Sequence, residues 1–331
     1  MFRYRLSAFA VLLLLPLCTG CPSLTPLPSQ AAVREMVEQE TGREYLLYVP
    51  SIYNNRRPWP VVIACHGTEP YDNPDRQMSE WAQFGEDQGI IVIAPRLLAA
   101  KGDFPPPVDK QIALQRSDEA AMLNMVRAIK ASYRVAEEQV FMTGWSAAAY
   151  DILHTGMSHP DIFRALLIRQ GTFDERYVDV SDRQLDRWQP IKIIYGSTDF
   201  LRDQAVACIK WLRDRGQYVE ELEVSGSHRR LEPETAWKFF REIVSKRPWI
   251  RMRMWAPDPR QPLTQSFAVD AVPSAKNVKW FFGDGADSFD AQPTHTYAAG
   301  GDYEVTLNVD LGGGKKFQRK RTLRVYQSGA N

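Results

Sequence analysis

Short apolar runs alternate with amphipathic stretches between residues 61 and 245. The runs have the length of strands and are rich in valine and isoleucine, which is typical of strands buried on both faces. We expect strands at residues 44–49, 61–65, 90–94, 140–143, 165–168, 191–195 and 218–224, and helices at residues 78–88, 117–132, 147–158, 204–215 and 234–245. This order predicts an α/β fold, a mostly parallel sheet with helices on both faces.

The pattern changes after residue 248. From Trp249 onward, short alternating strands and turns follow one another without a helical period. This stretch has about 80 residues, the size of an immunoglobulin-like β-sandwich. We therefore expect an α/β domain at residues 41–248 and a small β domain at residues 249–331.

One long segment of the α/β domain carries no clear period. Residues 96–116 contain three consecutive prolines, and loops of this length often act as lids or binding loops. Ser117 can cap the helix that follows. We expect the substrate pocket to be built by residues 97–108, the segment after Gly171 and residues near Asp199.

The first residues have the features of an export signal. Arginines precede an apolar run over residues 9–17, which is too short to span a membrane, and Gly20-Cys21 follows. Gly20-Cys21 also resembles a bacterial lipobox, in which the cysteine becomes the lipidated first residue. We expect a signal peptide at residues 1–20, a tether at residues 21–40, and an exported protein anchored in the cell envelope by a lipid on Cys21. Secretion without the lipid is the alternative.

Charge and cysteine content exclude several classes of protein. Lys and Arg number 41 against 40 Asp and Glu, so no basic field attracts nucleic acid. A hydrophobic content of 44% rules out a chain that is disordered throughout. Cys65 and Cys208 are predicted as buried thiols, and a disulfide between them stays open after export. No spacing of cysteine or histidine resembles a zinc site, and we expect no metal.

The strand at residues 140–143 runs into a Gly-Trp-Ser-Ala-Ala turn that opens a helix. A nucleophile elbow has this layout, because its sharp turn needs small flanking residues and lifts a serine hydroxyl clear of the sheet. Ser146 would then stand at a helix N-terminus, which favours developing negative charge. The usual motif is G-x-S-x-G, and Ala148 replaces its last glycine. A serine that only caps the helix is the alternative.

A second turn, His66-Gly67-Thr68, directly follows the strand at residues 61–65. A backbone N–H of this turn can face the nucleophile. Together with the N–H of Ala147 it would form an oxyanion hole.

An acid and a histidine follow two later strands. Asp199 comes after the strand at residues 191–195, and His228 after the next strand. The carboxyl ends of parallel strands share one edge of the sheet, where ligands bind. The chain order Ser146, Asp199, His228 is the order of α/β-hydrolase triads. Asp203 and Asp174 are weaker alternatives for the acid.

Residues 43–247 resemble an α/β-hydrolase of the polyhydroxybutyrate depolymerase and feruloyl esterase-like group. Residues 43–50 are similar to its opening strand, residues 61–67 to its oxyanion strand and turn, and residues 144–149 with 159–163 to its elbow helix and exit. The resemblance implies an enzyme that needs no cofactor.

The same resemblance implies residue roles. Ser146 attacks an acyl carbonyl, His228 transfers the proton, and Asp199 orients the imidazole. Thr68 and Ala147 offer oxyanion N–H groups and Gly67 gives the backbone room to approach. His66 shapes that turn and borders the pocket. Trp145 either lines the acyl pocket or packs in the core.

These inferences predict an exported serine esterase acting on acyl or aryl esters, including esters linked to polysaccharide. A serine peptidase of the same fold is an alternative. A surface-binding protein with an inactive hydrolase fold is another, and Ala148 is its main support.

Residues 250–326 resemble a PKD domain. Its motifs are W-F-F-G-D-G at residues 280–285, P-T-H-T-Y at residues 293–297 and G-D-Y-E-V at residues 301–305. The resemblance implies an immunoglobulin-like β-sandwich with Trp280 in its core, used as an adhesive or spacing module that contacts polysaccharide or the cell surface. A calcium ion at Asp284 and Asp287 is a weaker alternative.

Overall fold

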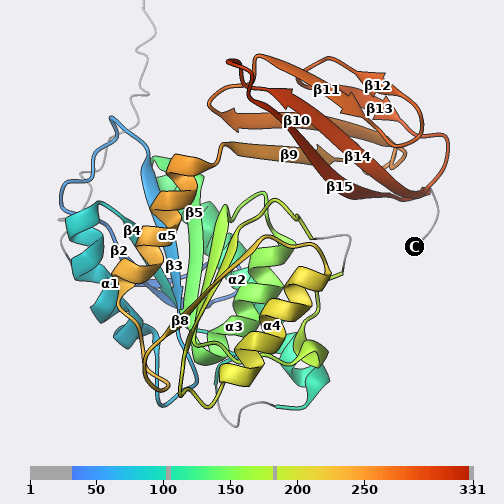
Figure 1. Ribbon diagram of the computed structural model, residues 1–331. Helices are drawn as coiled ribbons and strands as arrows, with labels where there is room; N and C mark the ends of the chain where they lie inside the picture. Colours follow the sequence, from blue (N-terminus) through green and yellow to red (C-terminus); the bar gives the residue numbers. More distant parts are fainter. Residues whose placement is uncertain (1–31, 102–105, 182–184, 328–331) are drawn as a thin grey trace, which may run out of the picture.

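The computed structural model describes residues 32–101, 106–181 and 185–327. An eight-stranded sheet in the order β1-β2-β4-β3-β5-β6-β7-β8 forms the centre of the N-terminal domain (Figure 1). Its strands are β1 (Arg34–Val37), β2 (Glu44–Tyr48), β3 (Trp59–Cys65), β4 (Ile91–Pro95), β5 (Val135–Trp145), β6 (Ala165–Arg169), β7 (Ile191–Gly196) and β8 (Val219–Val224). Neighbours from β4 to β8 pair in parallel, whereas β2 pairs antiparallel with β1 and β4. The predicted α/β fold is confirmed.

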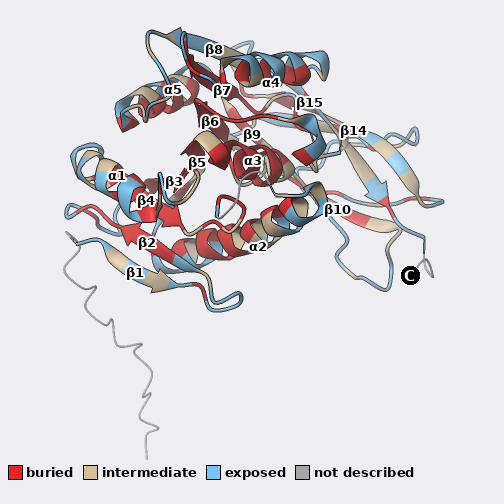
Figure 2. Cartoon of the chain, turned by 90° about the horizontal axis from the view of Figure 1, so that it is seen from below, coloured by how far each residue is buried: buried red, intermediate tan, exposed pale blue. Residues whose placement is uncertain are grey.

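Helices cover both faces of this sheet. They are α1 (Pro74–Gln88), α2 (Val108–Ser132), α3 (Ala149–Asp151), α4 (Arg202–Asp214) and α5 (Pro233–Lys246). Helices α1 and α5 cover one face, where Trp81 and Phe240 enter the core. Helices α2, α3 and α4 cover the other face, where Met125 and Ile209 enter it (Figure 2). Because both faces are buried at the centre of the sheet, β3 and β4 are wholly apolar.

Helix α2 differs from the sequence prediction. It begins at Val108 instead of Ser117, so the prediction of one loop over residues 96–116 is wrong in its second half. The buried side of the early turns is made by polar side chains such as Gln115 and Asp118. Such turns show no apolar periodicity, so the sequence pattern does not indicate a helix there.

The N-terminal part of the domain begins earlier than predicted. Strand β1, inside the predicted tether at residues 21–40, pairs antiparallel with β2. The predicted signal peptide at residues 1–20 and Cys21 lie outside the described residues. Among the described residues, no helix is both long and apolar enough to cross a membrane.

The two cysteines within the described fold are free thiols. Cys65 lies on β3 and Cys208 on α4, and both are buried. Burial raises the pKa of both thiols, so they behave as small apolar groups.

The C-terminal domain is an immunoglobulin-like β-sandwich, as predicted. One sheet contains β13 (Thr294–Thr296), β10 (Thr264–Val272) and β9 (Trp249–Trp255), and the other contains β12 (Asp287–Ser288), β11 (Asn277–Phe281), β14 (Gly301–Asp310) and β15 (Lys316–Val325). Trp280 is fully buried between the sheets, beside Phe267 and Tyr297. The Tyr297 hydroxyl donates a 3.0 Å hydrogen bond to the carbonyl of Phe282, which fixes the corner after β11.

The acidic residues considered for calcium have other partners. The Asp284 carboxylate lies 2.7 Å from His295 Nε2, and the Asp287 carboxylate lies 3.1 Å from Lys279 Nζ. Among the described residues, no group of acidic, histidine or cysteine side chains is arranged to hold a metal ion.

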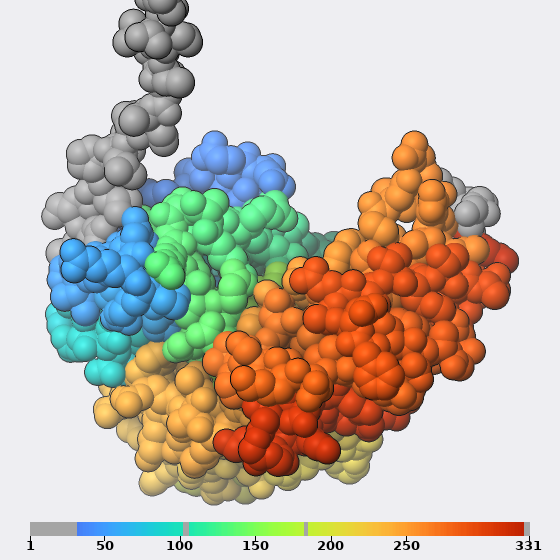
Figure 3. Space-filling model, turned by 90° about the horizontal axis from the view of Figure 1, so that it is seen from above, coloured from blue at the N-terminus to red at the C-terminus, as the bar shows by residue number. Residues whose placement is uncertain are grey.

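The sandwich packs against the edge of the central sheet where the parallel strands begin (Figure 1). Arg319 of β15 forms a buried ion pair with Asp186, which precedes β7. Arg251 of β9 lies 3.1 Å from Glu137, near the start of β5. In Figure 3, which looks onto this edge, the sandwich lies directly against the N-terminal domain. The opposite edge, where the strands end, is left open.

Candidate active site

Ser146 lies at the sharp turn between β5 and a short helical segment, Ser146–Ala148. Its φ is +55°, a left-handed conformation that is uncommon for serine. Two glycines make the turn possible. A Cβ on Gly67 would lie 2.7 Å from the Trp145 ring and 3.2 Å from Ser146 Cβ, and a Cβ on Gly144 would lie 2.9 Å from Cys65 Cβ. The structure therefore has the layout of a nucleophile elbow.

Ala148, where the usual motif has glycine, fits into the turn. Its side chain is fully buried and faces Gly144, because a Cβ on Gly144 would lie 2.6 Å from the methyl group of Ala148. The missing side chain of Gly144 provides the space for that methyl group. Ala148 thus gives no steric reason to regard the site as closed.

The structure brings Ser146, Asp199 and His228 together. His228 Nε2 lies 3.1 Å from Ser146 Oγ, and His228 Nδ1 lies 3.0 and 3.1 Å from the two carboxylate oxygens of Asp199. An ionised carboxylate only accepts hydrogen bonds, so in neutral His228 the proton sits on Nδ1 and Nε2 can accept the hydroxyl proton of Ser146. The Asp199 side chain is fully buried, and it also accepts a 2.8 Å hydrogen bond from the N–H of Leu201.

Two aromatic rings enclose His228. The Trp145 ring stacks on the imidazole at a centroid distance of 4.7 Å, and the Phe200 ring lies on it at the same distance with a tilt of 55°. Trp145 is 9% exposed and also lines the pocket, so it belongs to both the core and the site. The two rings restrict the orientation of the imidazole ring.

The N–H groups at the oxyanion turn differ in their partners. The N–H of Gly67 donates a 2.7 Å hydrogen bond to the buried carboxylate of Asp72, so it does not face the nucleophile. Among the hydrogen bonds of the described residues, none uses the N–H of Thr68. Ala147 lies in the first turn after the elbow, where N–H groups have no partner within the helix. Thr68 and Ala147 therefore carry the two available donors.

His66 does not line the pocket, contrary to the prediction that it borders the substrate. Its ring is fully buried. His66 Nε2 accepts a 3.0 Å hydrogen bond from the N–H of Leu97, so Nδ1 carries the proton and donates it to the carbonyl of Gly67 at 2.7 Å. Burial lowers the pKa of His66, which keeps the ring neutral. The residue fixes the conformation of the turn.

A cavity of about 650 Å³ opens above the serine. Its lining residues are Thr68, Glu69, Pro70, Tyr71, Trp145, Ser146, Thr172, Phe200, Leu201 and His228. The predicted contributions from the segment after Gly171 and from residues near Asp199 are present. Leu97 and Ala100 from the predicted segment 97–108 are buried in the core instead, and residues 102–105 of that segment lie outside the described residues.

Tyr71 of this pocket was missed by the sequence analysis, and Phe200 was covered only as a residue near Asp199, without being named. They are 74% and 76% exposed, although both are large aromatic residues. No periodicity marks them, since both lie in turns. Their nearness to the His66 turn and to Asp199 in the sequence was the available signal.

The other acids and histidines considered from the sequence lie elsewhere. The Asp203 side chain is fully exposed in the first turn of α4, and Asp174 is bound to Arg176. His154 and His159 both contact the Glu119 carboxylate, at 2.9 and 2.5 Å. None of these side chains lines the pocket above Ser146.

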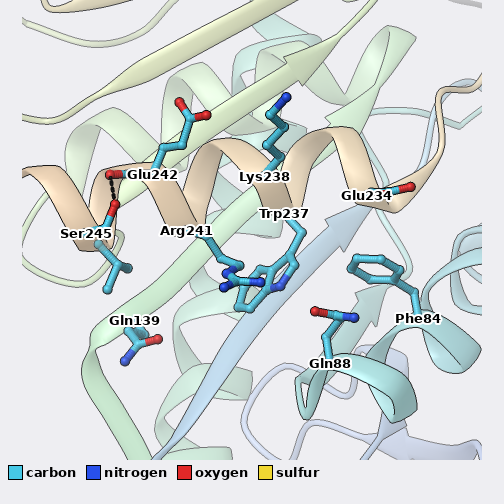
Figure 4. A pocket seen from close by; sticks show the side chains of 10 residues that line it. Phe84, Gln88, Gln139, Glu234, Trp237, Lys238, Arg241, Glu242 and Ser245 are labelled. Carbon is cyan, nitrogen blue, oxygen red and sulfur yellow. Dashed lines mark hydrogen bonds between the residues drawn. The ribbon is translucent and has the colours of Figure 1, made fainter.

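A second cavity, of about 720 Å³, lies between α1 and α5 (Figure 4). Phe84 and Gln88 of α1 face Trp237 and Arg241 of α5 across it. None of the triad or oxyanion residues lines this cavity. Although it is larger, it therefore contains no part of the chemistry predicted from the sequence.

The parallel sheet, the strand-to-helix elbow and the Ser146, Asp199 and His228 arrangement define the class of the N-terminal domain, which has the α/β-hydrolase fold. The C-terminal sandwich is a PKD domain, because residues 253–325 match the family model of that description. No protein of curated function matches the chain in sequence.

Several solved structures are similar to this chain. A candidate dipeptidyl aminopeptidase IV from Bacteroides ovatus is 15% identical with a TM-score of 0.50, and the match covers 64% of this chain and 36% of that one. An S-formylglutathione hydrolase from Staphylococcus aureus is 13% identical, with a TM-score of 0.48 and coverages of 65% and 95%. A ferulic acid esterase from Anaeromyces mucronatus is 14% identical, with a TM-score of 0.49 and coverages of 60% and 85%. At such low identity the first of these matches speaks for the fold alone, and the other two, with TM-scores below 0.5, carry no argument.

Proposed function

We propose that this protein is a serine hydrolase that cleaves carboxylic esters through an acyl-enzyme on Ser146. The continuous hydrogen-bonded line from Ser146 through His228 to Asp199 carries the proposal. A serine hydroxyl is a weak nucleophile at neutral pH unless an adjacent base accepts its proton, and His228 Nε2 stands at that position.

In the acylation step, Ser146 Oγ attacks the carbonyl carbon of the ester while its proton moves to His228 Nε2. The buried carboxylate of Asp199 stabilises the imidazolium that forms. The negative charge on the former carbonyl oxygen is met by the N–H groups of Thr68 and Ala147. The intermediate then collapses, the C–O bond to the alcohol breaks, and the alcohol leaves with the proton from His228.

In the deacylation step, water takes the place of the alcohol. His228 removes one proton from the water as it attacks the acyl carbon, and the same N–H groups stabilise the second intermediate. Breakage of the bond to Ser146 Oγ releases the acid, and the serine recovers its proton. The residues of this chain are sufficient for both steps.

The pocket supports esters with an apolar acyl or aryl group. Trp145, Leu201 and Phe200 line one continuous cavity with Ser146. Glu69 is the carboxylate in this lining, and Arg96 lies 3.6 Å from it. The resemblance of residues 43–247 to feruloyl esterase-like enzymes adds the carbohydrate-linked esters to this class.

Hydrolysis of p-nitrophenyl acetate and p-nitrophenyl butyrate by the purified full chain tests the proposal. We expect a burst of p-nitrophenol from acylation, lost in Ser146→Ala, and labelling of Ser146 by a fluorophosphonate probe. Background rates together with an unlabelled Ser146 would contradict the proposal and favour a binding protein with the same fold. Faster cleavage of peptide p-nitroanilides than of the esters would favour the peptidase alternative.

We further propose that the protein is exported and anchored in the cell envelope through a lipid on Cys21, as the arrangement of residues 9–21 suggests. Cells supplied with radiolabelled palmitate should yield a labelled protein in the membrane fraction. The label should be lost in Cys21→Ala. A wild-type protein that is unlabelled and recovered in the medium would favour secretion without a lipid.

For the PKD domain we propose contact with polysaccharide. The support is a groove of about 520 Å³ on β11, β14 and β15, whose lining includes Phe289, Asn308 and Gln318. Phe289 is 71% exposed, and an exposed aromatic ring beside side-chain amides suits a sugar surface. We expect the full chain to sediment with an insoluble polysaccharide, and Phe289→Ala to sediment less. Equal recovery of both proteins in the supernatant would contradict this role.

A further inference from the structure

Gln170, the residue that follows β6, has an unusual backbone conformation. Its φ is +49°, and among the described residues only Ser146 shares a positive φ without being glycine. Such a conformation is strained and persists where the surrounding structure imposes it. Asparagine and aspartate adopt it more readily than glutamine does. We therefore expect contacts of the Gln170 side chain to compensate for this strain.

That side chain binds the backbone on both sides of His228. Gln170 Nε2 donates a 3.0 Å hydrogen bond to the carbonyl of Ser227, and Gln170 Oε1 accepts one from the N–H of Arg229. Gln170 is 1% exposed, so water does not compete for these bonds. Its own N–H donates a 2.6 Å hydrogen bond to the carbonyl of Ile194 on β7, which ties it to the sheet.

The segment that carries His228 has no regular secondary structure. Its other ties lie further from the histidine, at the carbonyl of Gly226, which accepts a 3.1 Å hydrogen bond from the N–H of Thr198, and at Arg230, which pairs with Asp72 and Glu80. Strand β8 ends at Val224 and α5 begins at Pro233, and no helix or strand lies between them. His228 itself contacts Asp199 and Ser146 only through the tip of its side chain. A loop of this kind samples several conformations unless its backbone is tied to a rigid element.

We propose that Gln170 is a positioning residue for His228, holding the backbone at Ser227 and Arg229 so that the imidazole lies between Ser146 and Asp199. This inference rests on the proposed function, since it assigns a role within the same site. The left-handed turn directs the glutamine side chain toward the loop, which gives a reason for the strained conformation.

Neighbouring contacts extend this support to the oxyanion turn. Arg169, also fully buried, donates a 2.8 Å hydrogen bond to the carbonyl of Leu231 and a 2.6 Å bond to Gln77 Oε1. Gln77 Nε2 in turn donates to Asp72, which binds the N–H of Gly67. The end of β6 is thus connected both to the histidine loop and to the oxyanion turn.

Gln170→Gly is the first test, because glycine adopts a positive φ without strain while the two hydrogen bonds are lost. We expect kcat for p-nitrophenyl butyrate to fall by about tenfold to a hundredfold with little change in KM. The unfolding temperature should stay close to that of the wild type, since relief of strain offsets part of the loss. A structural role alone would lower the unfolding temperature and leave kcat in place.

Gln170→Glu provides a second variant of nearly the same shape. It keeps an acceptor for the N–H of Arg229 but cannot donate to the carbonyl of Ser227, so kcat should again fall. The matched control is Gln189→Met. Gln189 is also buried and donates to two backbone carbonyls, those of Gly156 and Phe163, but it lies outside the pocket. It should lose stability and keep its kcat.

An NMR measurement separates this inference from the proposed function. The proton that His228 Nδ1 shares with Asp199 should give a low-field signal when the ring is held in place, whatever the substrate. We expect the signal in the wild type and in Ser146→Ala, and its loss or broadening in Gln170→Gly. If the wild type cleaves no ester but the signal behaves in this way, the function fails and the positioning role stands. An unchanged signal, or a kcat within about twofold of wild type in both Gln170 variants, would overturn the inference.

Discussion

A buried arginine lies at each of the two edges of the central sheet, Arg169 of β6 at one and Arg319 of the sandwich at the other, and their partners differ. At the edge where the strands end, Arg169 binds a glutamine and a backbone carbonyl, and its nearest carboxylate is 3.9 Å away. At the edge where the strands begin, Arg319 pairs directly with Asp186 and also binds the carbonyl of Ile250. Burial lowers the pKa of both guanidinium groups.

The difference extends to the backbone. The catalytic edge, where the strands end, has both left-handed non-glycine residues of the described chain, Ser146 and Gln170, and a free N–H at Thr68. The docking edge, where the strands begin, has a buried ion pair with further hydrogen bonds around it. Reactive groups must stay available to a substrate, whereas a docking surface is most stable when each buried polar group has a partner. Substitutions at the catalytic edge should therefore change rates, and those at the docking edge should change stability.

The largest expected effect is at the catalytic edge. In Asp199→Asn, the amide no longer holds His228 in the tautomer that accepts the proton of Ser146, so kcat for ester hydrolysis should fall about 10⁴-fold. The unfolding temperature should change little, which thermal denaturation measures. Full activity in this variant would mean that His228 is oriented without the carboxylate of Asp199.

The next effect belongs to the docking edge. Arg319→Ala leaves Asp186 buried without its cation, which should lower the free energy of unfolding by about 3–5 kcal/mol in denaturant titrations. The rate of ester hydrolysis at 25 °C, in the absence of denaturant, should stay unchanged. The matched control is Arg324→Ala, an exposed pair with Asp302 whose loss should cost less than about 1 kcal/mol. Equal losses in both variants would show that the buried pair does not stabilise the docked sandwich.

A smaller effect is expected at Asp72, which holds the backbone of the oxyanion turn. Asp72 accepts hydrogen bonds from the N–H of Gly67 and from Gln77, and Asp72→Asn keeps only part of this set. Because the oxyanion turn is loosened, kcat should fall about tenfold, or ~1.4 kcal/mol in the barrier. Asp75→Asn, which removes an exposed charge nearby, is the control and should retain its kcat. A kcat for Asp72→Asn equal to that of the control would contradict the role of Asp72 in fixing the oxyanion turn.

The smallest effect concerns acid stability. Burial acts to raise the pKa of Glu119, but hydrogen bonds from His154 and His159 outweigh it and lower the pKa from 4.5 to about 2. A carboxylate whose pKa is lowered by folding stabilises the folded state at any pH above its pKa in the unfolded chain. This contribution is lost as the pH falls from 4.5 toward about 2. On unfolding in this pH range, Glu119→Gln should bind up to about one proton fewer than the wild type. Its free energy of unfolding should therefore change less with pH.

Denaturant titrations of wild type and Glu119→Gln at several pH values measure this difference. Parallel profiles through the acid window would contradict the role of Glu119. Ester hydrolysis near neutral pH serves as the control readout, because Glu119 does not line the pocket.

The positions of the triad side chains followed from the sequence because each comes directly after an apolar strand. Parallel strands bring their carboxyl ends to one edge, so Ser146, Asp199 and His228 could be expected to meet there. The small residues around Ser146 made the elbow recognisable. These signals are local, since each depends on the residues next to it in the chain.

Other features depend on contacts between distant residues. The early turns of α2 are buried through Gln111 and Asp118, whose polar side chains bind the backbone of Leu98 and Ala99 in the folded chain. The N–H of Gly67 is held by the buried carboxylate of Asp72, a contact that the sequence analysis did not predict. Neither case leaves a periodic pattern, because a buried polar residue is stabilised by its partner and not by its place in a helix or strand.

The sequence by itself determined the order of strands and helices, the elbow at Ser146, and the hallmark turns of the sandwich, because apolar periodicity and small or turn-forming residues act over a few positions. Tertiary structure alone decided which N–H groups face the nucleophile, how Gln170 holds the histidine loop, and where Arg319 docks the sandwich. Those outcomes join residues far apart in the chain. Their free energy comes from burial and hydrogen bonding, which exist only once the sheet has formed.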